Sequence, residues 1–196
     1  METQLYLKSG GTFSPDWCDL EVLKVTPGST FKMLKKNDFF LLSGKIQKTM
    51  GLVVKGLARG YIVDQDGNQI TIGFFSEGDY ATDYSNFIKQ QPSRYIIQCL
   101  EPTTFLCLSL KDLQTINRHS TKFENYHHLI AEEILNKQQA HLESFVFQTA
   151  EQRYIDFVKH YPRLFNRISL SHLCSYLGIE RQTLTRIRHK LASKRF

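Results

Sequence analysis

The chain has 196 residues, of which 41% are hydrophobic and 22% are charged, and its net charge is +6. These proportions exclude an intrinsically disordered chain and indicate a globular protein. The longest uncharged apolar stretch, Pro102 to Leu110, is far shorter than the ~20 residues that span a bilayer, and the first eleven residues contain no signal-peptide core. We therefore expect a cytoplasmic protein with no membrane segment.

The positive charge is confined to the C-terminal quarter of the chain. Residues 149–196 contain ten Lys or Arg and three Asp or Glu, whereas residues 1–148 contain fifteen and sixteen. Such a basic segment indicates either a polyanionic partner or a solvated basic face. The cysteines show no CxxC spacing, so we expect small core residues rather than disulfides or metal ligands. They are Cys18, Cys99, Cys107 and Cys174.

Residues 30–110 have the pattern of β-strands. Short apolar or alternating runs recur along this segment, separated by the turn sequences Asp66-Gly67-Asn68 and Glu77-Gly78-Asp79. Many short strands joined by regular turns predict a small antiparallel barrel or jelly roll. The runs are 52–54, 61–63, 69–74, 94–100 and 104–110.

A long helix is predicted from about Thr121 to Phe147. Thr121 and Glu124 fit a capping box at its start. The apolar residues that follow recur at gaps of three, four and seven, which places them on one broad face of the helix. That face either packs in the core or forms a seam with a second copy, and the length of about 37 Å favours the dimer. Its apolar residues are Phe123, Tyr126, Ile130, Ile134, Leu135, Leu142 and Phe145.

A further helix begins the C-terminal segment. Thr149 and Gln152 form a second capping box, and the apolar residues Tyr154 and Phe157 follow at helical spacing. Pro162 then ends or bends the helix.

Residues 169–191 have the layout of a helix-turn-helix. Ser169 can cap a first helix, and Gly178 can adopt the positive φ that a sharp turn needs. Glu180 can accept hydrogen bonds from the N–H groups of the second helix, whose polar face enters a DNA major groove in this motif. An ordinary helical hairpin with a basic exterior is the alternative. We expect the pair to bury Leu170, Leu173, Cys174, Leu177, Ile179, Leu184, Ile187 and Leu191, and to expose Arg181, Gln182, Thr185, Arg186 and His189.

These segments resemble the Crp/Fnr family of bacterial transcription regulators. The resemblance is carried by Val53–Tyr84, Thr149–Pro162 and Ser175–Leu191, and the string Ser-Tyr-Leu-Gly-Ile is typical of the Bacteroidetes branch. It implies an α+β fold with an eight-stranded β-roll, which is a double-stranded β-helix or jelly roll. The implied parts are a cyclic-nucleotide-binding-like sensor domain at 1–116, a dimerisation helix at 117–148 and a helix-turn-helix domain at 149–196.

The family reads DNA through an Arg-Glu-x-x-x-Arg pattern, which falls here on Arg181, Gln182 and Arg186. Two such arginines donate bidentately to guanine, whereas Gln pairs with adenine in place of the cytosine that Glu would contact. The resemblance therefore implies an operator that differs at that base. A two-fold dimer implies a palindrome with half-sites about 34 Å apart. Candidates for phosphate contacts are Thr183, Thr185, Arg188, His189 and Lys190.

The nucleotide-binding positions of the family are altered. Members that bind cyclic AMP use a Gly-Glu-Leu segment and an Arg-Ser pair, and the matching residues here are Thr82-Asp83-Tyr84 and Ser93-Arg94. The reversed order of Ser93 and Arg94 points the arginine to the other face of the strand. We therefore expect a pocket that takes another ligand or none.

An enzyme is the weaker alternative. A cupin-type metal site would need histidines on the strands, but all seven histidines lie at His119 or later. The sequence also contains no Gly-x-Ser-x-Gly, phosphate-loop or His-Glu-x-x-His motif. We therefore expect a protein that binds rather than catalyses, with no cofactor.

The expected partners follow from this interpretation. They are double-stranded DNA with a palindromic operator, a second copy of the chain and an unknown small-molecule effector, with RNA polymerase as a further candidate. The alternative function is a dimeric sensor module whose arginine-rich face binds an acidic protein instead of DNA.

Overall fold

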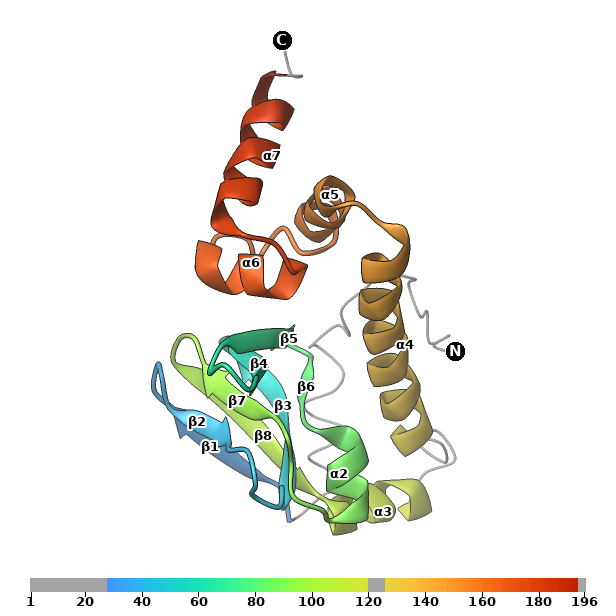
Figure 1. The fold of residues 1–196 in the computed structure, drawn as a ribbon. Helices are drawn as coiled ribbons and strands as arrows, with labels where there is room; N and C mark the ends of the chain where they lie inside the picture. The colour runs from blue at the N-terminus through green and yellow to red at the C-terminus, as the bar shows by residue number, and fades with distance from the viewer. Residues whose placement is uncertain (1–27, 120–125, 194–196) are drawn as a thin grey trace.

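The computed structural model describes residues 28–119 and 126–193 (Figure 1). Its strands form two four-stranded antiparallel sheets, so the predicted jelly roll is confirmed. Sheet A has the order β1-β8-β3-β6, and sheet B has the order β2-β7-β4-β5. The strands of sheet A are β1 (Thr30–Leu34), β8 (Thr103–Ser109), β3 (Thr49–Lys55) and β6 (Tyr80–Ala81). Those of sheet B are β2 (Phe39–Leu41), β7 (Ile96–Cys99), β4 (Ala58–Val63) and β5 (Gln69–Phe75).

The core of the roll lies between the two sheets. Val53 and Phe105 of sheet A pack with Ala58 and Ile97 of sheet B, and each is at most 1% exposed. Burial of this apolar surface is the main stabilising contribution to the roll.

The predicted turns occur where their residues can adopt positive φ. Gly67 has φ 83° in the β4–β5 hairpin, and the Asp64 carboxylate accepts from the N–H groups of Asp66 and Asn68. Gly78, between β5 and β6, has φ 90°. Glycine adopts such angles without the steric cost that other residues meet.

Three helices cover the outer face of sheet A. They are α2 (Tyr84–Lys89), α3 (Leu110–His119) and α4 (Tyr126–Phe147). Their contacts are with Met50 and Leu52 of β3 and Leu106 of β8, which form a second core with Ile130 of α4. The capping box expected at Thr121 and Glu124 lies outside the described residues.

The apolar residues of α4 do not form one face, which corrects the prediction. Ile130 is buried and Ile134 is partly buried against the roll, whereas Leu135 and Leu142 are 61% and 66% exposed. One side of the helix therefore completes the core, and another side carries unpartnered leucines.

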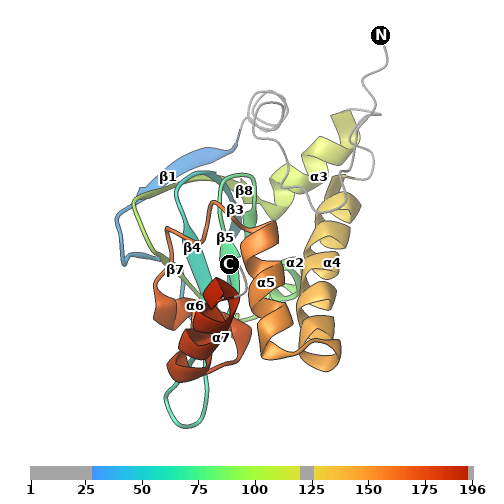
Figure 2. The same ribbon diagram turned by 90° about the horizontal axis from the view of Figure 1, so that it is seen from above.

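The C-terminal helices pack against one another and over the roll. They are α5 (Ala150–His160), α6 (Leu170–Leu177) and α7 (Arg181–Ser193). The Thr149–Gln152 capping box is formed as predicted, and Tyr154 and Phe157 are the buried residues of α5. Viewed from above, α5 lies between α4 and the α6–α7 pair (Figure 2).

Candidate nucleic-acid interface and sensor site

The turn between α6 and α7 has the geometry that the sequence predicted. The Ser169 hydroxyl caps α6 by accepting from the N–H of His172 at 3.1 Å. Gly178 ends the helix in the left-handed conformation with φ 62°, and the N–H of Ile179 donates to the Cys174 carbonyl at 3.1 Å. These bonds satisfy backbone groups that the helix ends leave free, and they fix the angle between the two helices.

The predicted core of the helix pair is confirmed at five residues, while Ile179 and Leu191 are only partly buried against it and Leu170 is not buried. Leu173, Leu177 and Leu184 are at most 2% exposed, and Ile187 is 7% exposed. Leu170, which we expected to be buried, is 49% exposed. Because Leu170 is the first residue of α6, its side chain lies at the edge of the helix pair rather than between the helices.

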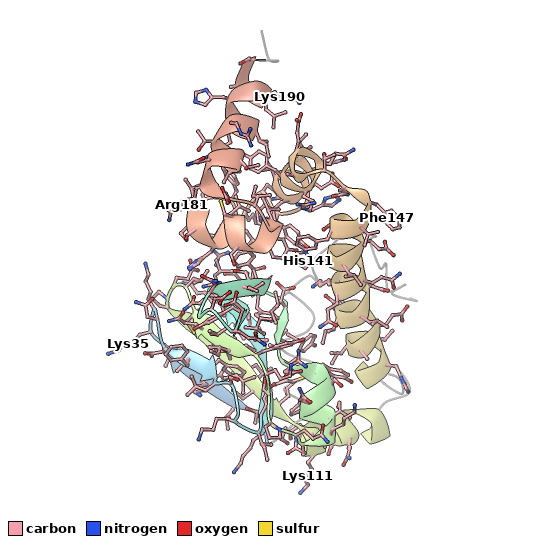
Figure 3. The ribbon with its side chains drawn as sticks, viewed as in Figure 1. Lys35, Lys111, His141, Phe147, Arg181 and Lys190 are labelled. Carbon is pink, nitrogen blue, oxygen red and sulfur yellow. The ribbon has the colours of Figure 1, made fainter. Side chains whose placement is uncertain are left out.

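The polar face of α7 is open to solvent. Arg181, near the start of the helix, and Lys190, near its end, are labelled in Figure 3. The exposed residues include all five that the sequence predicted for this face, while Thr183 and Arg188 are partly buried. The exposed set is Arg181, Gln182, Thr185, Arg186, His189 and Lys190.

Two of the residues expected at phosphates also have partners within the protein. The Lys190 ammonium lies 2.5 Å from the Glu151 carboxylate, and the Arg188 guanidinium lies over the Phe165 ring at 5.3 Å. These contacts fasten α7 to α5 and to the segment that follows it. Lys190 must therefore leave or share its ion pair to contact a phosphate.

The hydroxyls of α7 are used within the helix. Thr185 donates to the Arg181 carbonyl at 3.0 Å, and Thr183 accepts from Arg186 at 3.3 Å. A groove of about 340 Å³ runs beside this part of the helix. It is lined by Leu170, Arg181, Leu184, Thr185 and Arg188.

The expected ligand residues of the roll form a buried hydrogen-bonded network. Ser93 donates to the Asp83 carboxylate at 2.8 Å, and Asp83 accepts from Asn86 at 2.8 Å as well. The Gln47 amide oxygen accepts from the Thr82 hydroxyl at 3.2 Å and from the Asp83 N–H at 3.0 Å. Thus Thr82, Asp83 and Ser93 are brought together, and their polar atoms are largely bonded to one another.

Tyr84 and Arg94 have different surroundings. Arg94 is exposed, and Tyr84 begins α2 and packs against the outer core of sheet A. Gln47 was missed by the sequence reasoning, because it is 36 residues away from Asp83 and no local pattern links the two.

No group of three or more potential metal ligands occurs within the described residues. Cys99, Cys107 and Cys174 are free and buried, as expected, and burial raises the pKa of each thiol. Cys18 lies outside the described residues. Among the helices that the structure describes, none combines the length and the apolar character needed to cross a bilayer.

Comparison with known proteins identifies the roll. Residues 31–119 match the family model of the cyclic nucleotide-binding domain. No curated protein matches the chain in sequence.

The described residues have the fold of Crp/Fnr regulators, as expected. FixK2 from Bradyrhizobium japonicum has a TM-score of 0.73 at 17% identity, over 85% of both chains. TTHA1359 from Thermus thermophilus, a transcriptional regulator of the CRP/FNR family, has 0.63 at 15%, over 84% of this chain and 87% of its own. CLP from Xanthomonas campestris, a regulator that responds to c-di-GMP, has 0.66 at 15%, over 90% and 93%.

The roll differs from the cyclic-AMP-binding pattern at the positions expected to contact a nucleotide. Ser93 takes the buried site where the resemblance places an arginine, and Arg94 is turned to solvent. Asp83 is 4% exposed and bonded to Ser93. An arginine would neutralise a cyclic phosphate, whereas a carboxylate without that arginine repels it.

Proposed function

We propose that the chain is a homodimeric, sequence-specific DNA-binding transcription regulator. The observation that carries the proposal is the exposed polar face of α7, where Arg181, Gln182 and Arg186 lie on the second helix of a well-formed helix-turn-helix. Arginine and glutamine side chains are the groups that read guanine and adenine in a major groove. The concentration of positive charge in residues 149–196 supplies the attraction to the phosphates.

The dimer is supported by the free side of α4. Leu135, Leu142 and Val146 are spaced by seven and four residues, and each is more than 60% exposed. This spacing places them on one stripe of the helix, as in a coiled-coil seam. A second copy packed on this stripe would bury the leucines and present two recognition helices to one operator.

The effector and the remaining partners belong to the same proposal. The network of Asp83, Ser93 and Gln47 favours an effector other than cyclic AMP, or none. A regulator of this kind would act in the cytoplasm, where it meets DNA and RNA polymerase. The division into residues 1–116, 117–148 and 149–196 and the Bacteroidetes-type branch also stay predictions.

A salt titration separates this function from binding to an acidic protein. The protein is titrated onto a palindromic duplex and onto an unrelated duplex at several salt concentrations, by fluorescence anisotropy. We expect a steep salt dependence on both duplexes and tighter binding to the palindrome. Binding that is weak on every duplex, together with capture of an acidic protein domain, would favour the alternative module.

Two variants test the assigned roles of α7. Arg186→Ala should weaken palindrome binding by roughly 1–3 kcal/mol and relax the base preference at one position. Lys190→Ala should weaken both duplexes alike and lower the salt slope by about one. Equal losses from the two variants on every duplex would contradict these roles.

A further inference from the structure

One arginine of the DNA-binding segment is held by two glutamates of the roll. Arg167, between α5 and α6, donates from both terminal nitrogens to the Glu77 carboxylate at 2.8 and 2.9 Å. It also donates to Glu101 at 2.5 Å, and Glu77 accepts a further bond from the Gly56 N–H at 2.9 Å. A forked guanidinium on a carboxylate fixes direction as well as distance.

The same two parts are joined at the edge of sheet B. The Ser175 hydroxyl of α6 accepts from the Thr71 N–H at 2.9 Å and donates to the Gln69 carbonyl at 2.8 Å. β5 is an edge strand, so these are backbone groups that a neighbouring strand would otherwise bind. Ser175 thus attaches α6 directly to the backbone of the roll.

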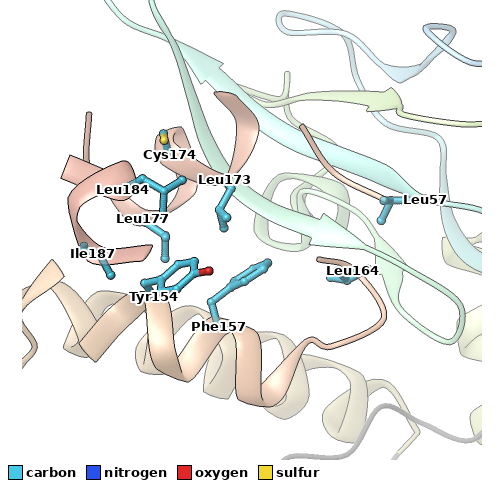
Figure 4. Packing of buried hydrophobic residues seen from close by; sticks show 9 residues of the cluster. All are labelled: Leu57, Tyr154, Phe157, Leu164, Leu173, Cys174, Leu177, Leu184 and Ile187. Carbon is cyan, nitrogen blue, oxygen red and sulfur yellow. The ribbon is translucent and has the colours of Figure 1, made fainter. Parts of the chain in front are cut away.

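Apolar residues of the roll complete the core of the helices. Leu57, between β3 and β4, is fully buried and belongs to one apolar cluster with residues of α5, α6 and α7. In Figure 4 it lies at the end of the cluster where Leu164 is drawn. The Phe74 ring of β5 lies 5.4 Å from the Tyr176 ring and 6.2 Å from the Phe157 ring, between centroids. The helices and the roll therefore share one hydrophobic cluster.

This docking of the helices on the roll leaves the polar face of α7 exposed. The attachments are made by α6 and by the segment before it, whereas Arg181, Gln182 and Arg186 of α7 stay exposed. The docked arrangement consequently fixes the direction of α7 without covering it. α4 adds two contacts of its own, because the His141 ring stacks on the Tyr176 ring of α6 and the Arg153 guanidinium of α5 lies over the Phe145 ring. The linker between α4 and α5 is only Gln148 and Thr149.

We propose that Arg167, through Glu77 and Glu101, is a positioning residue that sets the half-site spacing which the dimer accepts. The inference rests on the proposed function, because it concerns how two recognition helices are placed on one operator. Helices fixed to their rolls can reach half-sites at a single separation. Helices released from the rolls can reach half-sites at several separations, at a cost in affinity for the correct one.

The test uses charge variants of the full-length chain. Arg167→Glu brings three carboxylates together and should undock the helices. The double variant Glu77→Arg with Arg167→Glu restores a pair of opposite charges at positions 77 and 167, the forked pair of the native chain, and should dock them again. Arg163→Glu, an exposed position in the same segment, makes the same charge change away from the glutamates and is the matched control.

Duplexes with the selected spacing, or with one or two base pairs added or removed, supply the readout. The native chain and Arg163→Glu should lose more than about tenfold in affinity on the altered spacings. Arg167→Glu should bind the selected spacing more weakly and discriminate among spacings by less than about threefold, and the double variant should recover the discrimination. Full discrimination in Arg167→Glu, or none in the double variant, would overturn the inference.

A measurement without DNA separates this inference from the proposed function. Hydrogen exchange at the Thr71 amide reports the docked state, because that N–H donates to Ser175. Arg167→Glu should speed exchange at Thr71 but not in β8. Exchange in β8 would become faster only if the variant lost the fold of the roll itself. Unchanged exchange at Thr71 would overturn the inference even if the chain binds DNA. Failure of the native chain to bind any duplex would instead overturn the proposed function and, with it, the role in spacing.

Discussion

Ser93 donates a 2.8 Å hydrogen bond to the carboxylate of Asp83, and both residues are almost completely buried. In cyclic-AMP-binding relatives the resemblance places an arginine and a glutamate at these two positions. Here the site keeps a carboxyl group but lacks the buried arginine, so we expect it not to bind a cyclic phosphate.

We predict that cyclic AMP does not bind. Adding a large excess of cyclic AMP should leave the unfolding temperature unchanged, since only a ligand that binds the folded state raises it. Thermal unfolding followed by circular dichroism checks this, with AMP as the control for general nucleotide effects. A rise in unfolding temperature that is specific to the cyclic form would show that another group neutralises the phosphate.

Gly178 is predicted to tolerate no side chain. A Cβ at this position would lie 2.6 Å from Cε1 of Phe145, and the backbone has φ 62°. Gly67 has φ 83°, but a Cβ there would meet no atom within 4 Å, so this position isolates the backbone cost. Gly67→Ala should cost about 1–2 kcal/mol and Gly178→Ala at least about 1 kcal/mol more, by urea unfolding. Equal costs would show that the Phe145 contact relaxes freely.

Two partly buried histidines predict a loss of stability in mild acid. Burial, with Arg153 near His141 and Arg59 near His172, lowers the pKa of both below the usual 6.5. As the pH falls, the unfolded chain therefore binds protons before the folded chain does. The stabilising contribution of the two histidines is complete above the usual histidine pKa and decreases as the pH drops below it. The urea midpoint at about pH 7.5 and about pH 5.5 measures the effect.

The matched variants for this test keep the shape of the site. The His141 ring stacks on Tyr176 with centroids 4.2 Å apart, so His141→Phe keeps the stacking and removes the titration. His141→Phe and His172→Gln should together reduce the loss between the two pH values. The titration of Glu77 does not contribute to the difference between the two pH values. Burial opposes its ionisation, but bonds from Arg167 and Gly56 lower its pKa to about 2, so its contribution is lost only below the usual 4.5. A loss that is unchanged in the double variant would contradict the assignment to these histidines.

The exposed stripe of α4 predicts a dimer that leucine removal dissociates. Leu135→Ser with Leu142→Ser should shift the chain from dimer to monomer in sedimentation velocity, because the stripe would no longer bury apolar surface. Val63→Ser, at a 50% exposed position on the roll, is the control and should leave the mass unchanged. A native chain that is monomeric at high concentration would disprove the seam.

Local patterns predicted the elements that depend on neighbouring residues. The β4–β5 hairpin follows from Asp66-Gly67-Asn68, and the α6–α7 turn follows from Ser169 and Gly178, since these residues act within their own turns. Leu170 was assigned wrongly because periodicity cannot show that a helix-starting residue has no element above it.

Contacts between distant segments could not be predicted. Leu57 lies between two predicted strands, yet it is buried in the core of the C-terminal helices. Gln47 bonds to Asp83 from a separate loop, and Arg167 reaches glutamates that are 90 and 66 residues away. Only tertiary packing brings these groups together, so a single sequence carries no local sign of them.

Gln182 is predicted to set the base preference at one position of the operator. Its amide pairs with adenine, whereas the carboxylate of Gln182→Glu accepts from cytosine. The variant should therefore change the preferred base at one symmetric pair of positions and leave the others unchanged. An unchanged preference would place Gln182 away from the base edges.

Selection of bound duplexes from a random DNA pool, with no ligand added, tests the proposed regulator most directly. We predict enrichment of a palindrome whose half-sites lie one helical turn apart, with adenine favoured at the position assigned to Gln182. Loss of the enrichment in Arg186→Ala would tie it to the exposed face of α7. A pool that stays random with the native dimer would contradict ligand-free operator binding by this protein.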